Sequence, residues 1–190
     1  MLPWPLRKLV PAARRRERAL RAAAVGLYAA AVAQARRPEF YAPALVPDTV
    51  DGRFDLVVLH VVLLVRRLNR DGADGADLAQ HLFDTTLDDM DRNLREMGAG
   101  DLGVGRRVKA MARAFYGRAR AYGAALDAGD RAALETALAR NLLGVAGEAH
   151  ASAAPIAAYV IAAEDRLAAL DRVPLWSGSA TFPAPPVAGA

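Results

Sequence analysis

Hydrophobic residues recur every three or four positions along most of the chain, which is the spacing of an α-helix with one buried face. The clearest case lies between residues 75 and 97. Its apolar stripe comprises Phe83, Leu87, Met90, Leu94 and Met97, and its polar stripe comprises Asp84, Asp88, Asp91 and Arg95. This pattern predicts an amphipathic helix over about 75–97, with Asp74 as its N-cap and Gly98 just past its end.

The same spacing predicts five further helices, separated by prolines and glycines. They cover about 14–36, 51–69, 104–126, 130–143 and 152–171. The helix over 51–69 is apolar on all faces, so we expect it at the centre of a bundle. No strand pattern or internal repeat is present. The predicted fold class is therefore all-α, a single helical-bundle domain of about six helices.

The two ends of the chain differ from this middle part. Residues 1–13 hold three prolines and predict a flexible basic lead-in, and the helical domain is expected over 14–172. Residues 173–190 are rich in proline, glycine and alanine and predict a disordered tail. Residues 38–51, with three more prolines, predict an extended loop.

Composition supports the helical prediction and excludes several classes of protein. The chain has 190 residues, the size of one domain, and 44 of them are alanine, the best helix former. Cysteine is absent. That excludes a disulfide scaffold, cysteine-ligated zinc, an iron–sulfur cluster and a thiol nucleophile.

Charge is concentrated at the N-terminus. Residues 1–37 hold nine lysines and arginines against Glu17, a net +8, although the whole chain carries only +4. The group that we expect to face a partner comprises Arg14, Arg15, Arg16, Arg18 and Arg21. Such a segment suits an anionic membrane surface or a nucleic acid equally well.

Neither apolar segment predicts a membrane span. Residues 14–35 resemble a signal sequence, but Arg21 interrupts the apolar part, so an amphipathic helix is the preferred interpretation. Residues 54–68 are shorter than the roughly 20 apolar residues that cross a bilayer, and charged residues bracket them. We expect a protein that is peripheral to the inner face of the cytoplasmic membrane.

Candidate catalytic groups are sparse. His60, His81 and His150 form no His-x-x-x-His or Glu-x-x-His pair, and His60 is expected as a hydrogen-bonded core residue. Residues 98–103 match G-x-G-x-x-G, but no strand precedes them, so a helix–helix turn is preferred over a nucleotide site. No serine lies in a nucleophile elbow. We therefore do not expect an enzyme, and we expect no metal, no cofactor and no small-molecule substrate. A helical enzyme that binds a metal through the acidic stripe is kept as an alternative.

Opposite charges occupy neighbouring predicted helices. Residues 71–96 hold eight acids and two arginines, and residues 101–120 hold six bases and one acid. The two faces can pair with each other across the turn, or they can form a polar surface that recognises a partner. Their alternating signs make a purely nucleic-acid-binding face less favoured, and DNA is not expected as a partner.

Two runs of sequence resemble the ubiquinol–cytochrome c chaperone family, whose members assist assembly of the cytochrome bc1 complex. One, at 81–118, reads HLFDTTLDDMDRNLREMGAGDLGVGRRVKAMARAFYGR, and the other, at 28–68, reads YAAAVAQARRPEFYAPALVPDTVDGRFDLVVLHVVLLVRRL. The first combines an acidic helix, a glycine turn and V-K-x-M-x-x-A-F-Y-G-R in order. The likeness extends over about residues 25–145 and is that of a bacterial member.

The resemblance implies a helical chaperone that binds newly made cytochrome b without bond chemistry. It also implies that the ribosome is a possible partner, because mitochondrial members work near the tunnel exit. The residues expected to line or support the client groove are Phe83, Leu87, Met90, Phe115 and Tyr116. Polar contacts are expected from Asp84, Asp88, Asp91, Arg95, Arg107, Lys109 and Arg118. The alternative is a basic membrane- or ribosome-associated adaptor with no dedicated role in bc1 assembly.

Overall fold

Seven α-helices and one short 3-10 helix make up the regular structure in the computed structural model, which describes residues 4–42, 45–96, 101–144 and 153–186. The α-helices are α1 (Trp4–Ala35), α2 (Val50–Asn69), α3 (Gly72–Glu96), α4 (Asp101–Ala128), α5 (Arg131–Asn141), α6 (Ala153–Ala168) and α7 (Arg172–Trp176). The 3-10 helix η1 covers Pro38–Tyr41. The all-α prediction is confirmed.

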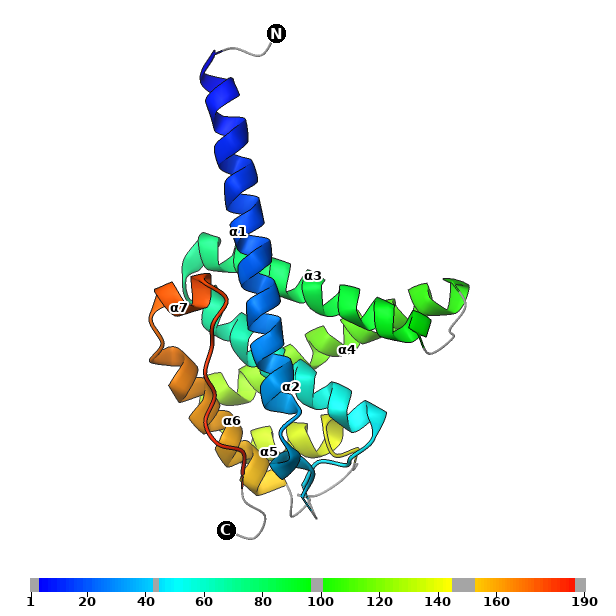
Figure 1. The fold of residues 1–190 in the computed structure, drawn as a ribbon. Coiled ribbons are helices and arrows are strands. Elements are labelled where there is room, and N and C mark those ends of the chain that lie inside the picture. Colours follow the sequence, from blue (N-terminus) through cyan, green and yellow to red (C-terminus); the bar gives the residue numbers. More distant parts are fainter. Residues whose placement is uncertain (1–3, 43–44, 97–100, 145–152, 187–190) are drawn as a thin grey trace.

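Helix α2 lies at the centre of the bundle, as its apolar sequence predicts. Leu56, Leu59 and Leu63 on it are fully buried, and α1, α3, α4 and α6 all contact it (Figure 1). Thr49 caps its first turn by accepting a hydrogen bond from the backbone N–H of Gly52. Burial of a large aliphatic side chain contributes about 1.5–3 kcal/mol, so this helix supplies much of the core.

Helix α1 begins at Trp4, earlier than the start expected near residue 14. Pro5 lies in the first turn, where a backbone N–H would have no helical partner in any case. The alanine- and arginine-rich sequence that follows favours a helix. Figure 1 shows α1 as a long helix whose N-terminal half stands out from the rest of the bundle.

The C-terminal segment also differs from the expected disordered tail. Residues 172–176 form α7, and residues 177–186, which we call the strap, run extended alongside α1 and α6 (Figure 1). Gln34 donates a hydrogen bond to the carbonyl oxygen of Pro183 at 2.8 Å, and the Phe182 ring meets the His60 ring edge-on at 5.0 Å. Local composition suggested disorder, but contacts with residues far away in the sequence hold the segment, and composition cannot reveal them.

Helix boundaries agree with the sequence at some ends and not at others. Asp130 caps α5 by accepting from the N–H of Ala133, as expected. Asp74 does not cap α3, because that helix already begins at Gly72. The loop expected over 38–51 contains η1, and it buries Phe40 completely. Gly98 lies outside the described residues.

Candidate functional site

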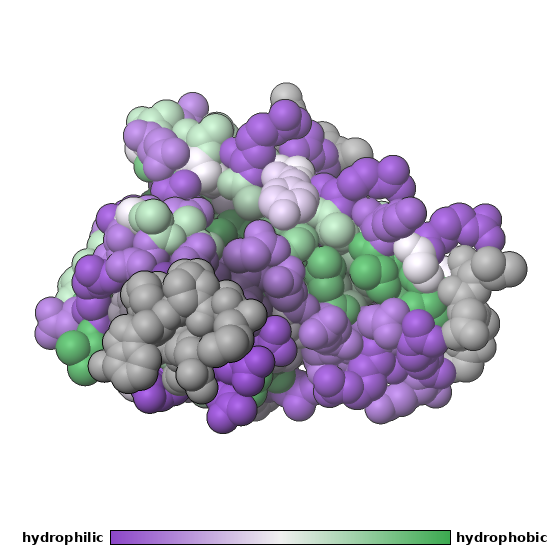
Figure 2. Space-filling model, turned by 90° about the horizontal axis from the view of Figure 1, so that it is seen from above, coloured by the Kyte–Doolittle hydropathy of each residue, from purple (hydrophilic) through white to green (hydrophobic). Residues whose placement is uncertain are grey.

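Helices α3 and α4 form an arm that extends from the body of the molecule (Figure 1). We call these two helices the arm. The residues that connect them, 97–100, lie outside the described part of the chain, as do the first three residues of the G-x-G-x-x-G match. Figure 2 shows apolar residues gathered over the arm between rows of hydrophilic ones. The sequence-predicted client residues lie on these two helices.

Three aromatic rings pack together where the two helices of the arm meet. The Phe83 ring centroid lies 4.9 Å from that of Phe115 and 5.1 Å from that of Tyr116. Phe83 and Phe115 are buried, while Tyr116 is 58% exposed. Two buried rings thus hold a third, exposed ring in place.

The other apolar candidates divide in the same way. Met90 is buried in the core, and Leu87 is half-buried against the core. Phe83, Met90 and Phe115 therefore belong to the core that supports the arm. Tyr116 and, in part, Leu87 are the apolar candidates that a partner can reach.

The polar candidates on α3 face outward. Asp84 and Asp88 are exposed, and Asp84 accepts a hydrogen bond from Gln80. Asp91 is half-exposed and forms an ion pair with Arg95 one turn further along, at 2.6 Å. Exposed pairs of this kind contribute only about 0.3–0.5 kcal/mol, so they leave the carboxylates largely available.

The basic candidates on α4 are not equivalent. Arg107 and Lys109 are exposed. Arg118, by contrast, lies 2.7 Å from the carboxylate of Asp55 on α2 and also donates to the carbonyl oxygen of Asn141. Only 16% of its side chain is exposed. Arg118 therefore joins α4 to two helices of the body, α2 and α5, and is less available to a client than Arg107 and Lys109.

Several residues of the two charged faces pair with other helices of the bundle. Asp74 and Asp77 of α3 form ion pairs with Arg16 of α1, at 3.0 and 2.8 Å. Arg118 of α4 pairs with Asp55 of α2. For these residues the partners lie on helices far away in the sequence, which helical periodicity alone cannot identify.

Some arginines of the predicted basic group on α1 form ion pairs, and others are exposed to solvent. Arg16 holds α1 to α3, and Arg21 donates to Glu17 at 2.8 Å. Arg14, Arg15 and Arg18 are exposed.

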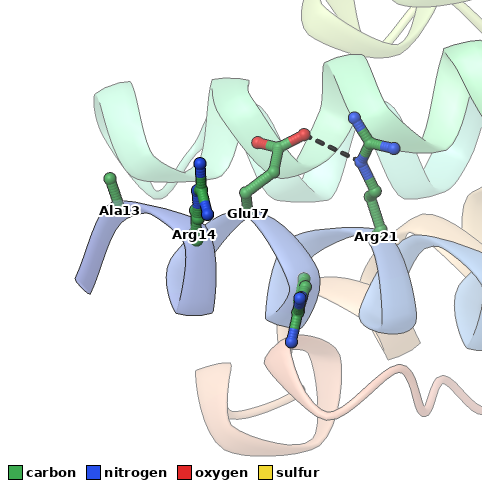
Figure 3. A pocket seen from close by; sticks show the side chains of 5 residues that line it. Ala13, Arg14, Glu17 and Arg21 are labelled. Carbon is green, nitrogen blue, oxygen red and sulfur yellow. Dashed lines mark hydrogen bonds and ion pairs between the residues drawn. The ribbon is translucent and has the colours of Figure 1, made fainter. Parts of the chain in front are cut away.

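A shallow, open depression lies along this part of α1, lined by Ala13, Arg14, Glu17, Arg18 and Arg21. In Figure 3 the side chains of Arg14, Glu17 and Arg21 rise from the same side of the helix. The second carboxylate oxygen of Glu17 lies 3.3 Å from Nε2 of His81 on α3. The depression is too open to enclose a small molecule, and its character is cationic.

The surroundings of His60 and Asp55 on the central helix shift the pKa values of both side chains. His60 is fully buried, as expected for a core histidine, and burial lowers its pKa to about 4. Burial raises the pKa of Asp55 to about 6, and the neighbouring Arg118 offsets only part of that effect. The Asp55–Arg118 contact was missed from the sequence; the one signal was an aspartate within an otherwise apolar run.

No cluster of three histidine or acidic residues suited to a metal occurs within the described ranges. Over the same residues, no helix is long and apolar enough to cross a bilayer. What the arrangement offers is two surfaces: an arm with an exposed aromatic residue among charges, and a projecting basic helix.

Known proteins resemble this chain over most of its length. Residues 44–182 match the model of the ubiquinol-cytochrome C chaperone family. The crystal structure of the Cbp3 homologue from Brucella abortus superposes with a TM-score of 0.80 at 39% sequence identity, covering 93% of this chain and 97% of that one.

A curated relative from Xenopus laevis, ubiquinol-cytochrome-c reductase complex assembly factor 1, is 26% identical over 124 residues. The match covers 65% of this chain and 62% of the relative, so the chain spans less than two thirds of that protein's length. The family match extends over well more than half of the chain and includes the arm, the central helix and α6. The chain belongs to the ubiquinol–cytochrome c chaperone family.

Proposed function

We propose that this protein is an assembly chaperone of the cytochrome bc1 complex, and that the exposed side of the arm binds newly made cytochrome b. The observation that carries the proposal is the exposed ring of Tyr116 packed against the buried rings of Phe83 and Phe115. In this proposal the protein binds and releases its client and makes or breaks no covalent bond.

The apolar part of the arm is suited to a hydrophobic client. A large exposed aromatic residue costs free energy in water, and such residues are enriched where proteins bind one another. Because Tyr116 is supported by two buried rings, it loses little side-chain entropy on binding. Leu87, half-buried against the same core, adds apolar area to the arm.

The charged part of the arm supports reversible binding. Asp84, Asp88, Arg107 and Lys109 are exposed and can contact polar loops of a client. Charges at the edge of an interface speed association and select partners more than they add affinity. A chaperone must release its client, and this division of roles favours exchange over permanent binding.

The test is purification of the tagged protein from membranes of cells that are building the bc1 complex. Tyr116→Ala should lower the recovery of cytochrome b several-fold and lower the b-haem absorbance of the membranes. Tyr116→Phe keeps the ring and should restore both. Val173→Ala serves as a matched control, because Val173 is a large exposed apolar residue away from the arm, on α7.

The proposal fails if Tyr116→Ala protein, present at the normal level, recovers as much cytochrome b as the unaltered chain. It also fails if cells lacking the protein contain normal amounts of bc1 complex. Recovery of ribosomal proteins without cytochrome b would favour the adaptor alternative.

A further inference from the structure

The N-terminal half of α1 has a surface that the bundle does not cover. Leu20 is the first buried residue of the helix, and every described side chain before it is exposed except the half-buried Glu17. Figure 1 shows this half standing clear of the other helices. Apart from the polar contacts of Arg16 and Glu17 with α3, the described side chains before Leu20 do not pack in the core, so the exposed side of this half needs a reason other than core packing.

The charge of this half is strongly positive. Seven basic residues and a single acid, Glu17, lie between residues 1 and 21. Glu17 is engaged by Arg21, and Arg16 by two aspartates of α3, so Arg14, Arg15 and Arg18 carry the exposed positive charge. The N-terminus of a helix also carries about half a positive charge from its aligned peptide dipoles. The potential at this end is therefore attractive to a polyanion.

The sequence favours a bilayer over a nucleic acid as that polyanion. Residues 1–13 combine two bases with Trp4, three leucines and a valine. A basic helix that also contains tryptophan and leucine is typical of segments that lie at the membrane–water interface. A surface that binds RNA combines basic residues with several aromatic residues on which nucleobases stack. This segment has only one aromatic residue, Trp4.

We propose that the projecting half of α1 docks this protein on the surface of an anionic lipid bilayer. Arg14, Arg15 and Arg18 make the electrostatic contacts with the headgroups, while Arg16 and its aspartate partners keep α1 fixed to the bundle. The inference does not depend on the identity of the client, because it concerns how the protein reaches a membrane and not what the arm binds there.

The test is co-sedimentation of the full chain with phosphatidylcholine vesicles that either contain or lack phosphatidylglycerol. We expect binding only to the anionic vesicles and a steep loss of binding as salt is added. Each basic residue near an anionic surface contributes about 1 kcal/mol, so Arg14→Glu, Arg15→Glu and Arg18→Glu together should weaken binding roughly a hundredfold or more. Circular dichroism checks that the variant keeps its helices.

The matched control replaces three exposed arginines of α4 with glutamate: Arg106→Glu, Arg113→Glu and Arg120→Glu. It makes the same change in net charge as the test variant. Its affinity for anionic vesicles should stay within about threefold of the unaltered chain if binding is local to α1. Equal losses in the two variants would overturn the proposal, as would absence of binding at low salt. Binding of an RNA oligonucleotide as tightly as of anionic vesicles would overturn it in favour of a nucleic-acid surface.

Discussion

The hydroxyl of Tyr159 on α6 lies 2.7 Å from Nε2 of His60 on α2, in a fully buried part of the core. Nδ1 of the same ring lies 2.7 Å from the carbonyl oxygen of Leu56, which can only accept. Nδ1 therefore donates, Nε2 of the neutral ring accepts from the tyrosine hydroxyl, and that hydroxyl accepts from Gln34 on α1 at 3.0 Å. One directional chain of hydrogen bonds thus joins α1, α6 and α2.

Tyr159→Phe is expected to destabilise the fold, because it removes the middle of this chain and leaves Nε2 of His60 buried without a partner. The loss of unfolding free energy should be about 1–3 kcal/mol, as for other buried groups left unsatisfied. Urea unfolding at neutral pH measures it. Tyr41→Phe is the control: Tyr41 is half-buried and loses one hydrogen bond, to the carbonyl oxygen of Ala35. Equal losses in both variants would contradict a special role for the chain.

His60 and Asp55, five residues apart on α2, have opposite effects on stability as pH falls. The pKa of His60 is lowered to about 4 by burial, so the unfolded chain takes up a proton that the folded one refuses, and stability is lost from about pH 6.5 to 4. The pKa of Asp55 is raised to about 6 by burial, so the folded chain takes up a proton first, and stability is gained from about pH 6 to 4. The two contributions largely cancel in the unaltered protein.

Asp55→Asn should remove one side of this balance. Relative to the unaltered chain, the variant should lose about 2 kcal/mol of unfolding free energy between neutral pH and about pH 4.5, because one pKa unit corresponds to about 1.4 kcal/mol. Urea unfolding at the two pH values measures the difference. Asp88→Asn, at an exposed position of α3, should instead follow the unaltered chain at both. Parallel behaviour of all three proteins would contradict the assignment.

The parts of the fold that depend on periodicity could be predicted from the sequence. The stripe that includes Phe83, Met90 and Leu94 is buried, because a helix with one apolar face has only one way to face the core. The position of α2 followed from its apolar residues on every face. The strap could not be predicted, because its order depends on contacts with α1 and α6, which are separated from each other by most of the chain.

The candidate site shows the same division. The sequence assigned the apolar and acidic candidates to two helices that the structure shows side by side in the arm, but it could not tell exposed Tyr116 from buried Phe115 beside it. It also could not tell that Arg118 is engaged in an ion pair while Arg107 is exposed, because the partner of Arg118 depends on where α4 crosses α2. Residue type and spacing identify a face, whereas burial and long-range pairing decide which members of that face are free to bind.

Arg67 on α2 makes long-range contacts whose contribution to stability can be measured by substituting this residue. Its guanidinium donates to the carbonyl oxygens of Leu167 and Leu170 at the end of α6, at 3.0 and 2.8 Å, and to Asp71 at 3.0 Å. Lysine has one ammonium group and cannot make three contacts in one plane. Arg67→Lys should therefore cost about 2–4 kcal/mol, measured by urea unfolding, with Arg15→Lys at an exposed position as the neutral control. A cost below about 0.5 kcal/mol would show that α6 does not depend on this contact.

Gly26 on α1 and Gly178 at the start of the strap bring two backbones into direct contact. A Cβ atom at Gly26 would overlap the carbonyl oxygen of Gly178, and Gly178 has a φ of 83°, which other residues rarely adopt. In an exposed helix, glycine to alanine stabilises by about 0.5–1 kcal/mol. Gly26→Ala should do the reverse and destabilise by about 1–3 kcal/mol, because the strap must move away.

Gly117 on α4 supplies the matched comparison, since a Cβ atom there meets nothing within 4 Å. Gly117→Ala should stabilise the fold while Gly26→Ala weakens it, so the two identical changes have opposite signs. Release of the strap should also open the Trp176–Ser177 bond at its start to cleavage by chymotrypsin; the Phe182–Pro183 bond is no site, because chymotrypsin does not cleave before proline. Gly26→Ala protein that is as stable as Gly117→Ala protein and equally resistant to cleavage would show that the strap does not depend on this approach. Faster cleavage confined to Gly26→Ala protein would show that the close approach of the two glycines holds the C-terminal segment on α1.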